Sequence, residues 1–573
     1  MKTRNSFRWL GISLCCVSGA LFTGCGGDSS DSPIAEQPPE PRSCEQLVGL
    51  EIPSSVMELS TSGGEVTAAT VVAASGSGAA AIPEHCLVSG RIAPVDSEAP
   101  DILFRVALPT DWNSKVLMFG GGGFNGSIPA LTGHVSQGAS SQPTPLGRGY
   151  ATFASDSGHQ ANEYGSQDGR WGLNDEAVRN FSGEALKKTR DAATFVVRTR
   201  YASAPTQHYF AGGSTGGREA LTNIQRWPED WDGAIAWYPA WNNVAALLAG
   251  QHISLALAEP GAYPNSEKRQ LLLDASLQAC DDLDGVEDGI ISDQSQCNDT
   301  FDPATATVNG NPLRCPGGAD DGNHCLSDAQ INALEAMDEG VDFNFPLASG
   351  ETGYPGSNVW GADLGITSIN TPVQPTVVFL ALGTLQPAQP DMPRSAPYLS
   401  VLVDQWVKYS VAGDAAFNSF DLDPINPEPQ YAERISELSG LLNSGTDISA
   451  FADRGGKLLL AHGLSDVLVS SRATRIYYER LVDQMGAEEV DEFVRYYEVP
   501  GFGHGASSHF NATWDSLTAL ENWVEEDTAP ENQVTTDTIG EPGRTRPLCD
   551  YPAWPRYIEV GDPMEAASFE CVE

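Results

Sequence analysis

One glycine-rich stretch constrains the fold of this chain more than any other. Residues 208–218 read His-Tyr-Phe-Ala-Gly-Gly-Ser-Thr-Gly-Gly-Arg, so an apolar run ends in the pattern Gly-x-Ser-x-Gly around Ser214. Glycines two residues before and after a serine permit the tight strand-to-helix turn of a nucleophile elbow. An ordinary glycine-rich β–α turn fits the same pattern, because the chain contains 58 glycines. The choice between the two depends on groups elsewhere in the chain.

Strands and helices alternate around this turn, as they do in a mainly parallel α/β sheet. Apolar segments predict strands at 102–108, 115–119 and 150–154. Residues 184–201 have the apolar clustering of a helix and lead into the strand before Ser214. We therefore expect an α/β fold with a mainly parallel sheet.

Two late strands lead to an acid and a histidine. The strand predicted at 456–461 precedes Asp466, and the strand at 494–499 precedes His504. Serine, acid and histidine in this chain order are typical of α/β-hydrolases. We predict that Ser214 is a nucleophile, that His504 is its base and that Asp466 orients the imidazole.

Two other histidines compete for the role of the base. His462 is too close to Asp466 in sequence to be expected as its partner, and His509 has no strand directly before it. We therefore favour His504.

A second glycine-rich loop, at 120–123, follows the strand predicted at 115–119. Its backbone N–H groups suit the stabilisation of an oxyanion, so we expect the donors to be Thr215 and either Gly121 or Gly122. A phosphate-binding loop is the rival interpretation, but no Gly-Lys-Ser/Thr follows the glycines.

Residues 243–447 interrupt the alternation with long loops, prolines and four cysteines. We interpret this segment as an inserted lid domain over the site. Within it, Asp281, Asp284 and Asp288 stand among glycines and between cysteines, which favours a calcium loop over a merely solvated acidic loop. The glutamate that closes a regular EF-hand is missing.

The N-terminus has a basic start, a short apolar run and small residues before Cys25, which indicate a secretory signal peptide with a lipobox-like end. Lipid attachment at Cys25 is expected, and Gly26 in place of Asp favours the outer membrane over inner-membrane retention. Ordinary secretion is the alternative. The expected division of the chain is a signal peptide at 1–24, a lipid-anchored flexible tether at 25–43, a first core part at 44–242, the lid at 243–447 and a second core part at 448–573.

The net charge of −44 argues against nucleic acid as a partner. Beyond Cys25 the chain has an even number of cysteines, which in an exported protein implies disulfides. Eight cysteines permit 105 pairings. Short sequence separations favour four local pairs: Cys44–Cys86, Cys280–Cys297, Cys315–Cys325 and Cys549–Cys571.

Several motifs together resemble the tannase and feruloyl esterase family, which includes bacterial mono(2-hydroxyethyl) terephthalate hydrolase. These motifs are Ser-Asp-Ser-Gly-His at 155–159, Gly-Gly-Ser-Thr-Gly-Gly-Arg at 212–218, Trp-Pro-Glu-Asp-Trp-Asp-Gly at 227–233, Pro-Gly-Phe-Gly-His at 500–504 and Arg-Thr-Arg-Pro-Leu-Cys at 544–549. The resemblance extends over essentially the whole chain beyond the signal. It implies an α/β-hydrolase core with an inserted, calcium-carrying lid.

The resemblance also implies particular ligands for calcium and fits the four local disulfides. The calcium ligands would be Asp281, Asp284 and Asp288 with the backbone carbonyls of Val286 and Ile290. One departure concerns a disulfide that the family usually forms between a cysteine just before the serine and another just after the histidine. Both positions are glycine here, Gly213 and Gly505.

These observations predict a serine carboxylic ester hydrolase that forms an acyl-enzyme and acts on aromatic acid esters of the feruloyl, galloyl, hydroxybenzoyl or terephthaloyl type. Trp360, Tyr398, Trp406 and Arg394 are candidate pocket residues in the lid. Two alternatives stay open: a non-catalytic surface lipoprotein that binds aromatic or polyester ligands, and an acyltransferase on the same scaffold.

Overall fold

The largest element of the structure is a ten-stranded sheet of order β1-β2-β3-β4-β6-β5-β7-β8-β13-β14. The structure is a computed structural model that describes residues 40–573. The strands of the sheet are β1 (Glu51–Ile52), β2 (Gly64–Val72), β3 (His85–Ile92), β4 (Ile102–Pro109), β5 (Lys115–Phe119), β6 (Ala151–Ser155), β7 (Gln207–Gly213), β8 (Gly233–Trp237), β13 (Lys457–Gly463) and β14 (Val494–Val499). The six strands from β6 to β14 in this order are parallel, whereas β1 to β4 pair antiparallel and β4 joins β6 antiparallel. The expected α/β fold is confirmed.

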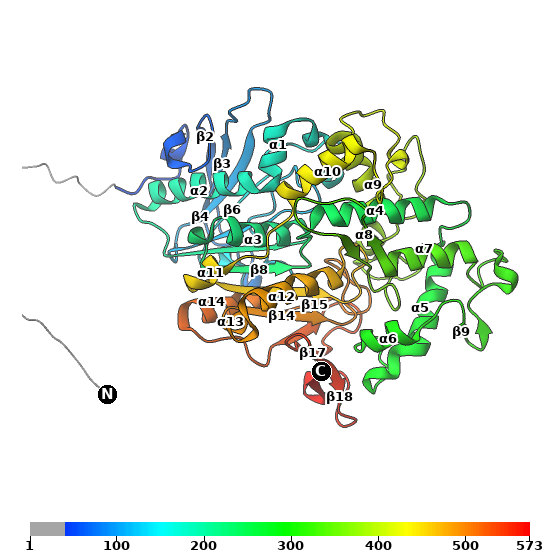
Figure 1. The fold of residues 1–573 in the computed structure, drawn as a ribbon. Helices are drawn as coiled ribbons and strands as arrows, with labels where there is room; N and C mark the ends of the chain where they lie inside the picture. The colour runs from blue at the N-terminus through cyan, green and yellow to red at the C-terminus, as the bar shows by residue number, and fades with distance from the viewer. Residues whose placement is uncertain (1–39) are drawn as a thin grey trace, which may run out of the picture. The chain divides into compact units, whose positions relative to one another are not determined.

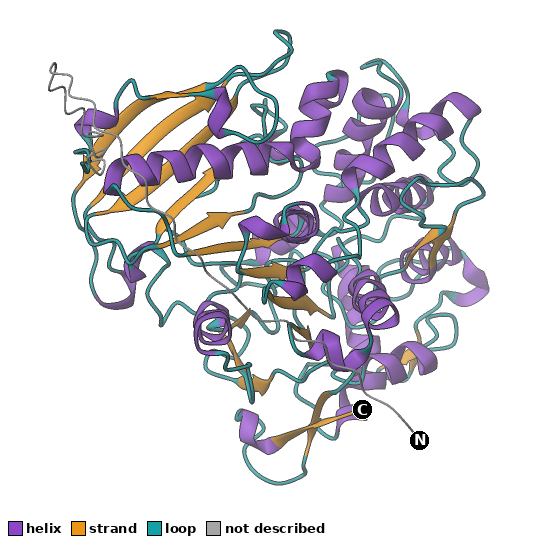
Figure 2. Cartoon of the chain, turned by 60° about the vertical axis from the view of Figure 1, so that its left-hand side comes forward, coloured by secondary structure: helices purple, strands orange, loops and turns teal. Residues whose placement is uncertain are grey.

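Side chains alternate between the two faces of this sheet, and a different helix layer covers each face. Along β13, Leu458 and Leu460 belong to one buried cluster and Leu459 to another. The first cluster includes residues of α2 (Ala185–Tyr201), α3 (Thr215–Arg226) and α12 (Ser471–Met485), and the second includes residues of α14 (Ser516–Glu526). Figure 2 shows the twisted strands with helices packed beside them. The strands are therefore covered on both faces, as parallel sheets require.

The segment between β8 and β13 adds no strand to the large sheet. Its elements are α4 (Asn243–Ala258), α5 (Ser266–Cys280), α6 (Gln294–Thr300), β9 (Thr307–Val308), β10 (Asn311–Pro312), α7 (Asp328–Glu339), β11 (Gly340–Asp342), β12 (Gly353–Pro355), α8 (Gln374–Leu380), α9 (Tyr398–Trp406), α10 (Pro429–Leu442) and α11 (Ser449–Asp453). The helices α4, α5, α6 and α7, green in Figure 1, lie on one side of the sheet. Residues 40–573 form one compact unit. The insertion is therefore recognised from the order of the strands and not from a gap in the packing.

The remaining short α-helices and strands lie outside the large sheet. They are α1 (Asp175–Arg179), α13 (Ala487–Asp491), β15 (Ala512–Thr513), β16 (Val534–Asp537), β17 (Thr545–Pro547), β18 (Trp554–Tyr557) and β19 (Phe569–Val572). Strands β15, β16 and β17 form a small antiparallel sheet, and β18 pairs with β19.

All four local disulfides are formed in the structure. They join Cys44 to Cys86, Cys280 to Cys297, Cys315 to Cys325 and Cys549 to Cys571. Each bond therefore closes one local segment. The first joins the start of the described chain to β3.

The expected signal peptide at 1–24, the lipidation site Cys25 and most of the tether at 25–43 lie outside the described residues. In the part of the chain that is described, no helix combines the length and the apolar character needed to cross a membrane.

The loop that each disulfide closes sets its expected contribution to stability. Cys44 and Cys86 are 42 residues apart, and Cys315 and Cys325 are 10 apart. By the chain-entropy relation, replacing the first pair with alanine should lower the free energy of unfolding by about 4 kcal/mol, and replacing the second pair by about 3 kcal/mol. Urea unfolding of the two double variants checks the order. A larger loss for Cys315→Ala/Cys325→Ala would contradict it.

Candidate active site

Ser214 lies on a strained turn between β7 and α3, with φ 60° and ψ −124°. Its N–H donates to the carbonyl of Trp237, 3.0 Å away at the end of β8. A Cβ atom at Gly212 would lie 2.5 Å from the carbonyl of Gly216, and one at Gly216 would lie 2.7 Å from the carbonyl oxygen of Gly121. The two glycines of the motif are therefore required for close backbone contact, and the turn is a nucleophile elbow.

Asp466 and His504 follow β13 and β14, and the structure brings them together. His504 Nδ1 is 2.6 Å from Asp466 Oδ2, and the other oxygen, Oδ1, accepts hydrogen bonds from the N–H groups of Leu468 and Val469. Asp466 is completely buried. Burial alone would raise the pKa of Asp466, but the charge and hydrogen bond of His504, with a second hydrogen bond from His462, hold it well below its usual range. The carboxylate therefore stays ionised beside the imidazole.

His462 also contacts this carboxylate, which corrects the sequence-based expectation. Its Nε2 is 3.3 Å from Asp466 Oδ2 and 3.0 Å from the carbonyl of Val469, and its Nδ1 is 2.8 Å from Thr474 Oγ1. The turn after β13 folds back, so four residues of separation do not prevent the contact. His462 has no exposed surface, so it supports Asp466 and does not reach a substrate.

The backbone N–H of Gly121 already donates a hydrogen bond within the protein. It donates to Glu219 Oε2 at 2.9 Å, and Asn125 Nδ2 donates to the other oxygen of this buried carboxylate. A Cβ atom at Gly122 would meet nothing within 4 Å, so the space beside Gly122 is open. Of the two predicted glycine donors, the hydrogen bond to Glu219 therefore rules out Gly121 in this conformation and leaves Gly122. Thr215 is the first residue of α3, where N–H groups have no intrahelical partner.

Within residues 40–573, no hydrogen bond joins the Ser214 hydroxyl to His504. Catalytic hydrogen bonds are often long without substrate and tighten when it binds. The loops that follow β5, β7, β13 and β14 nevertheless lie at one edge of the sheet, because these strands are parallel.

A pocket open to solvent lies beside His504. Apolar side chains from the insertion and from the loop after Asp466 line it: Val377, Leu380, Val467 and Leu468. Asp363 and His509 add polar groups. The sequence pattern gave no indication of these residues, because α8 and its surrounding loops carry no motif.

The four lid residues predicted from their side-chain types do not line this pocket. Trp406 is fully buried, and Trp360 packs against Phe301 with 5.4 Å between ring centroids. The hydroxyl of Tyr398 lies 3.0 Å from that of Ser166, and the Arg394 guanidinium stacks on a tyrosine ring. Packing therefore accounts for these side chains.

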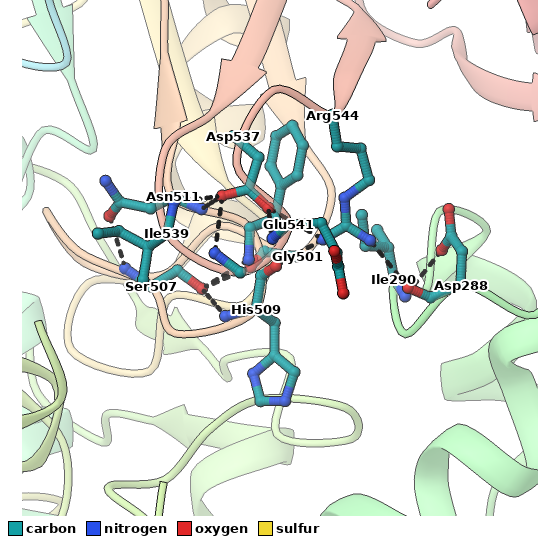
Figure 3. Close-up of polar contacts among 12 residues, drawn as sticks. Asp288, Ile290, Gly501, Ser507, His509, Asn511, Asp537, Ile539, Glu541 and Arg544 are labelled. Atoms are coloured by element: carbon teal, nitrogen blue, oxygen red, sulfur yellow. Dashed lines mark hydrogen bonds and ion pairs between the residues drawn. The ribbon is translucent and has the colours of Figure 1, made fainter. Parts of the chain in front are cut away.

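The C-terminal segment holds the loop that follows His504 (Figure 3). Arg544 donates to the backbone carbonyls of Asp288 and His509 and to Asp537 Oδ2, at 2.9, 2.5 and 3.1 Å. Asp537 Oδ1 in turn accepts from the N–H of Asn511 at 3.0 Å. One buried arginine therefore links the acidic loop, the histidine loop and the small C-terminal sheet.

The acidic loop contains the three expected aspartates, but the structure shows no group of three His, Cys, Asp or Glu side chains in metal-binding geometry anywhere in residues 40–573. Asp281 accepts from the N–H of Gly289 at 3.0 Å, and Asp288 pairs with Arg546. Asp284 is buried, and its Oδ2 accepts no well-aligned hydrogen bond from any of residues 40–573. Burial raises the pKa of Asp284 to about 7; the nearby Ser292 hydroxyl opposes this shift, and the charges of Asp288 and Asp281 add to it.

Residues 86–572 match the family model described as tannase and feruloyl esterase. The chain belongs to this family. It is a carboxylic ester hydrolase, and its core is the α/β-hydrolase fold with the nucleophile elbow after β7.

The relatives of this esterase extend over nearly all of its length. An uncharacterized esterase of Agrobacterium fabrum is 38% identical and covers 92% of this chain and 93% of its own. The mono(2-hydroxyethyl) terephthalate hydrolase of Piscinibacter sakaiensis is 34% identical and covers 88% of each chain. The crystal structure of feruloyl esterase B from Aspergillus oryzae superposes with a TM-score of 0.71, at 22% identity, over 91% of this chain and all of its own. That structural likeness shows a shared fold.

The lowered pKa of Asp466 gives a test that depends on pH. The ionised carboxylate stabilises the fold fully above the ordinary aspartate pKa of about 4. This contribution is lost as pH falls from there towards the lower value of the folded state, because the unfolded chain takes up a proton that the folded chain does not.

We therefore expect Asp466→Asn to destabilise the protein more at pH 7 than at pH 3, measured by urea unfolding at both values. The exposed Asp453→Asn controls for the loss of one carboxylate. An equal effect of Asp466→Asn at the two pH values would contradict the ion pair.

Proposed function

We propose that this esterase hydrolyses aromatic acid esters through Ser214, His504 and Asp466. His504 accepts the proton of the Ser214 hydroxyl as the oxygen attacks the ester carbonyl, and it then gives this proton to the leaving alcohol. Asp466 keeps the proton of the imidazole on Nδ1 and stabilises the imidazolium. Water, activated by His504, releases the acid from the acyl-enzyme. The observation that carries the proposal is the 2.6 Å contact between His504 and a buried, doubly hydrogen-bonded Asp466.

The oxyanion of the tetrahedral intermediates is held by the N–H groups of Thr215 and Gly122. Thr215 is at the N-terminus of α3, where the helix dipole favours a negative charge. Glu219 fixes the glycine loop through Gly121, and this leaves Gly122 beside open space. Donors held by a rigid backbone need no reorganisation during the reaction.

An aromatic acyl group is the substrate class that the comparisons and the pocket support. Relatives that cover most of this chain include a mono(2-hydroxyethyl) terephthalate hydrolase and probable feruloyl esterases. The apolar lining beside His504 suits an aromatic ring or an apolar alcohol. Feruloyl, galloyl, hydroxybenzoyl and terephthaloyl esters are therefore the panel to test.

The buried pair of Asp466 and His504 counts against a non-catalytic lipoprotein that only binds aromatic ligands. Burying an ionised aspartate costs free energy unless the charge is paired and hydrogen-bonded, and here both oxygens of Asp466 form hydrogen bonds. An acyltransferase on this scaffold would differ from an esterase only in the acceptor of the acyl group. With an acyltransferase, added alcohols would take most of the acyl group and little free acid would form.

We propose further that calcium binds in the acidic loop and supports the fold. Its ligands are Asp281, Asp284 and Asp288 with the carbonyls of Val286 and Ile290. The buried Oδ2 of Asp284, which accepts no well-aligned hydrogen bond within residues 40–573, supports this assignment, because a hard cation would satisfy it. The loop is linked to the histidine loop by Arg544, so the metal has a structural role and takes no part in the chemistry.

The esterase is exported, in keeping with its four disulfides. We propose that lipid on Cys25 holds it at the outer membrane through the tether at 25–43.

The triad is tested by Ser214→Ala on the panel of aryl esters. We expect kcat to fall by about 10⁴-fold or more, because the nucleophile is lost while the fold remains. Unchanged thermal unfolding provides the control for folding. Full activity of Ser214→Ala would show that another group carries out the reaction.

Calcium is tested by thermal unfolding in calcium and in chelator. Free calcium at a concentration of 100 times its Kd adds about 2.7 kcal/mol to the free energy of unfolding, so Tm should rise by several degrees in calcium. Asp284→Asn should abolish the response, and the exposed neighbour Asp282→Asn should keep it. The assignment fails if wild-type Tm is equal in both buffers.

A further inference from the structure

Tyr238 is the first residue after β8 and has a left-handed backbone, with φ 34°. Its N–H donates to the carbonyl of Ala461 at 2.7 Å, and the preceding residue, Trp237, accepts the N–H of Ser214. A positive φ at a bulky residue is uncommon and persists only where surrounding contacts enforce it. The backbone of Tyr238 is therefore fixed between the strand of the serine and the strand before Asp466.

The ring of Tyr238 lies between the two glycines that flank Ser214 and His504. A Cβ atom at Gly213 would lie 2.6 Å from Cε2 and from Oη of the ring. A Cβ atom at Gly505 would lie 3.5 Å from the same Oη. The ring thus fills the space between the serine turn and the histidine loop, and a side chain at 213 cannot coexist with it.

The same ring contacts the imidazole directly. The ring centroids of Tyr238 and His504 are 4.7 Å apart at an angle of 56°. Gln137 Nε2 donates to Tyr238 Oη at 3.1 Å and to the carbonyl of Gly505 at 3.2 Å. One amide therefore joins the tyrosine hydroxyl to the backbone of the histidine loop.

We infer that Tyr238 is a positioning residue, which holds His504 at the Ser214 turn by packing where no covalent link joins the two loops. The serine turn is held by the backbone hydrogen bond from Ser214 to Trp237, the residue before Tyr238. The histidine loop is held by contact of His504 with the tyrosine ring and by the hydrogen bond from Gln137. The inference rests on the proposed role of His504 as the base. In addition, the distance between base and nucleophile depends on the aromatic ring of the residue that follows β8.

Removal of the ring should affect the chemical step more than binding. Tyr238 does not line the pocket beside His504, so removal of the ring leaves that lining unchanged. The imidazole loses the surface it packs against, and a misplacement of about 1 Å at a catalytic group costs roughly 10²-fold in rate. A loss in kcat with little change in KM is the signature of an interaction used in the transition state.

The experiment compares Tyr238→Ala and Tyr238→Phe with the wild type on one aryl ester. We expect Tyr238→Ala to lower kcat by about 10²-fold with KM changed less than about threefold. Tyr238→Phe keeps the ring and should retain kcat within about tenfold, because it loses only the hydrogen bond from Gln137. A kcat for Tyr238→Ala within twofold of the wild type would overturn the inference.

Gly213→Ala tests the same contact without removing the ring. Gly213 does not have a positive φ, so alanine is permitted by its backbone, and the three atoms nearest to an added Cβ all belong to Tyr238. Alanine at 213 should therefore lower kcat in the wild type but have little further effect in Tyr238→Ala. Equal losses in both backgrounds would contradict the steric coupling.

The variants distinguish a failure of the role of Tyr238 from a failure of the proposed mechanism. If Tyr238→Ala does not fold, the test depends on the single variant Gly213→Ala. An unchanged kcat of this variant overturns the inference. Full activity of Ser214→Ala would remove the proposed mechanism itself. Inactive Ser214→Ala with normal Tyr238→Ala would reject only the role of Tyr238.

Discussion

Close contact between backbones at the serine turn is the constraint on which the rest of the site depends. Ser214 has a strained backbone with positive φ because β7 must pass directly into α3, and side chains at Gly212 or Gly216 would collide with the opposite backbone. The same contact brings the glycine loop after β5 against the start of α3, since Gly216 donates its N–H to the carbonyl of Gly121. The nucleophile and the proposed oxyanion donors are therefore fixed by one packing arrangement.

The charges of the site are arranged around that turn so that few atoms need to move. Asp466 is fully buried, and backbone N–H groups and imidazoles satisfy both its oxygens. Glu219, also buried, orients the glycine loop. Both carboxylates act through a neighbouring group, His504 in one case and Gly121 in the other. Preorganised polar groups of this kind are the main source of rate enhancement in many enzymes.

Features encoded by local pattern could be predicted from the sequence. The strands before Ser214, Asp466 and His504 are visible as apolar runs, and the disulfides join cysteines that are close in sequence. The family resemblance then supplied the fold around them, because several motifs lie in the expected order.

Features that depend on tertiary contact could not be predicted in the same way. Glu219 meets the N–H of Gly121 across 98 residues of sequence, so no local pattern shows that this donor is taken. The fold-back that brings His462 to Asp466 depends on the turn after β13. Tyr238 reaches Gly213 and Gly505 only because β8 lies between β7 and β13 in the sheet. The sequence shows the two glycines but not the ring that fills the space between them.

Covalent labelling shows whether His504 activates Ser214 as the nucleophile. The mature protein is treated with an aryl fluorophosphonate and digested, and the modified residue is located by mass spectrometry. We expect one adduct, on the peptide that contains Ser214, formed at least about 10³-fold more slowly in His504→Ala. An adduct on another residue, or ester hydrolysis that persists in fully labelled protein, would contradict it.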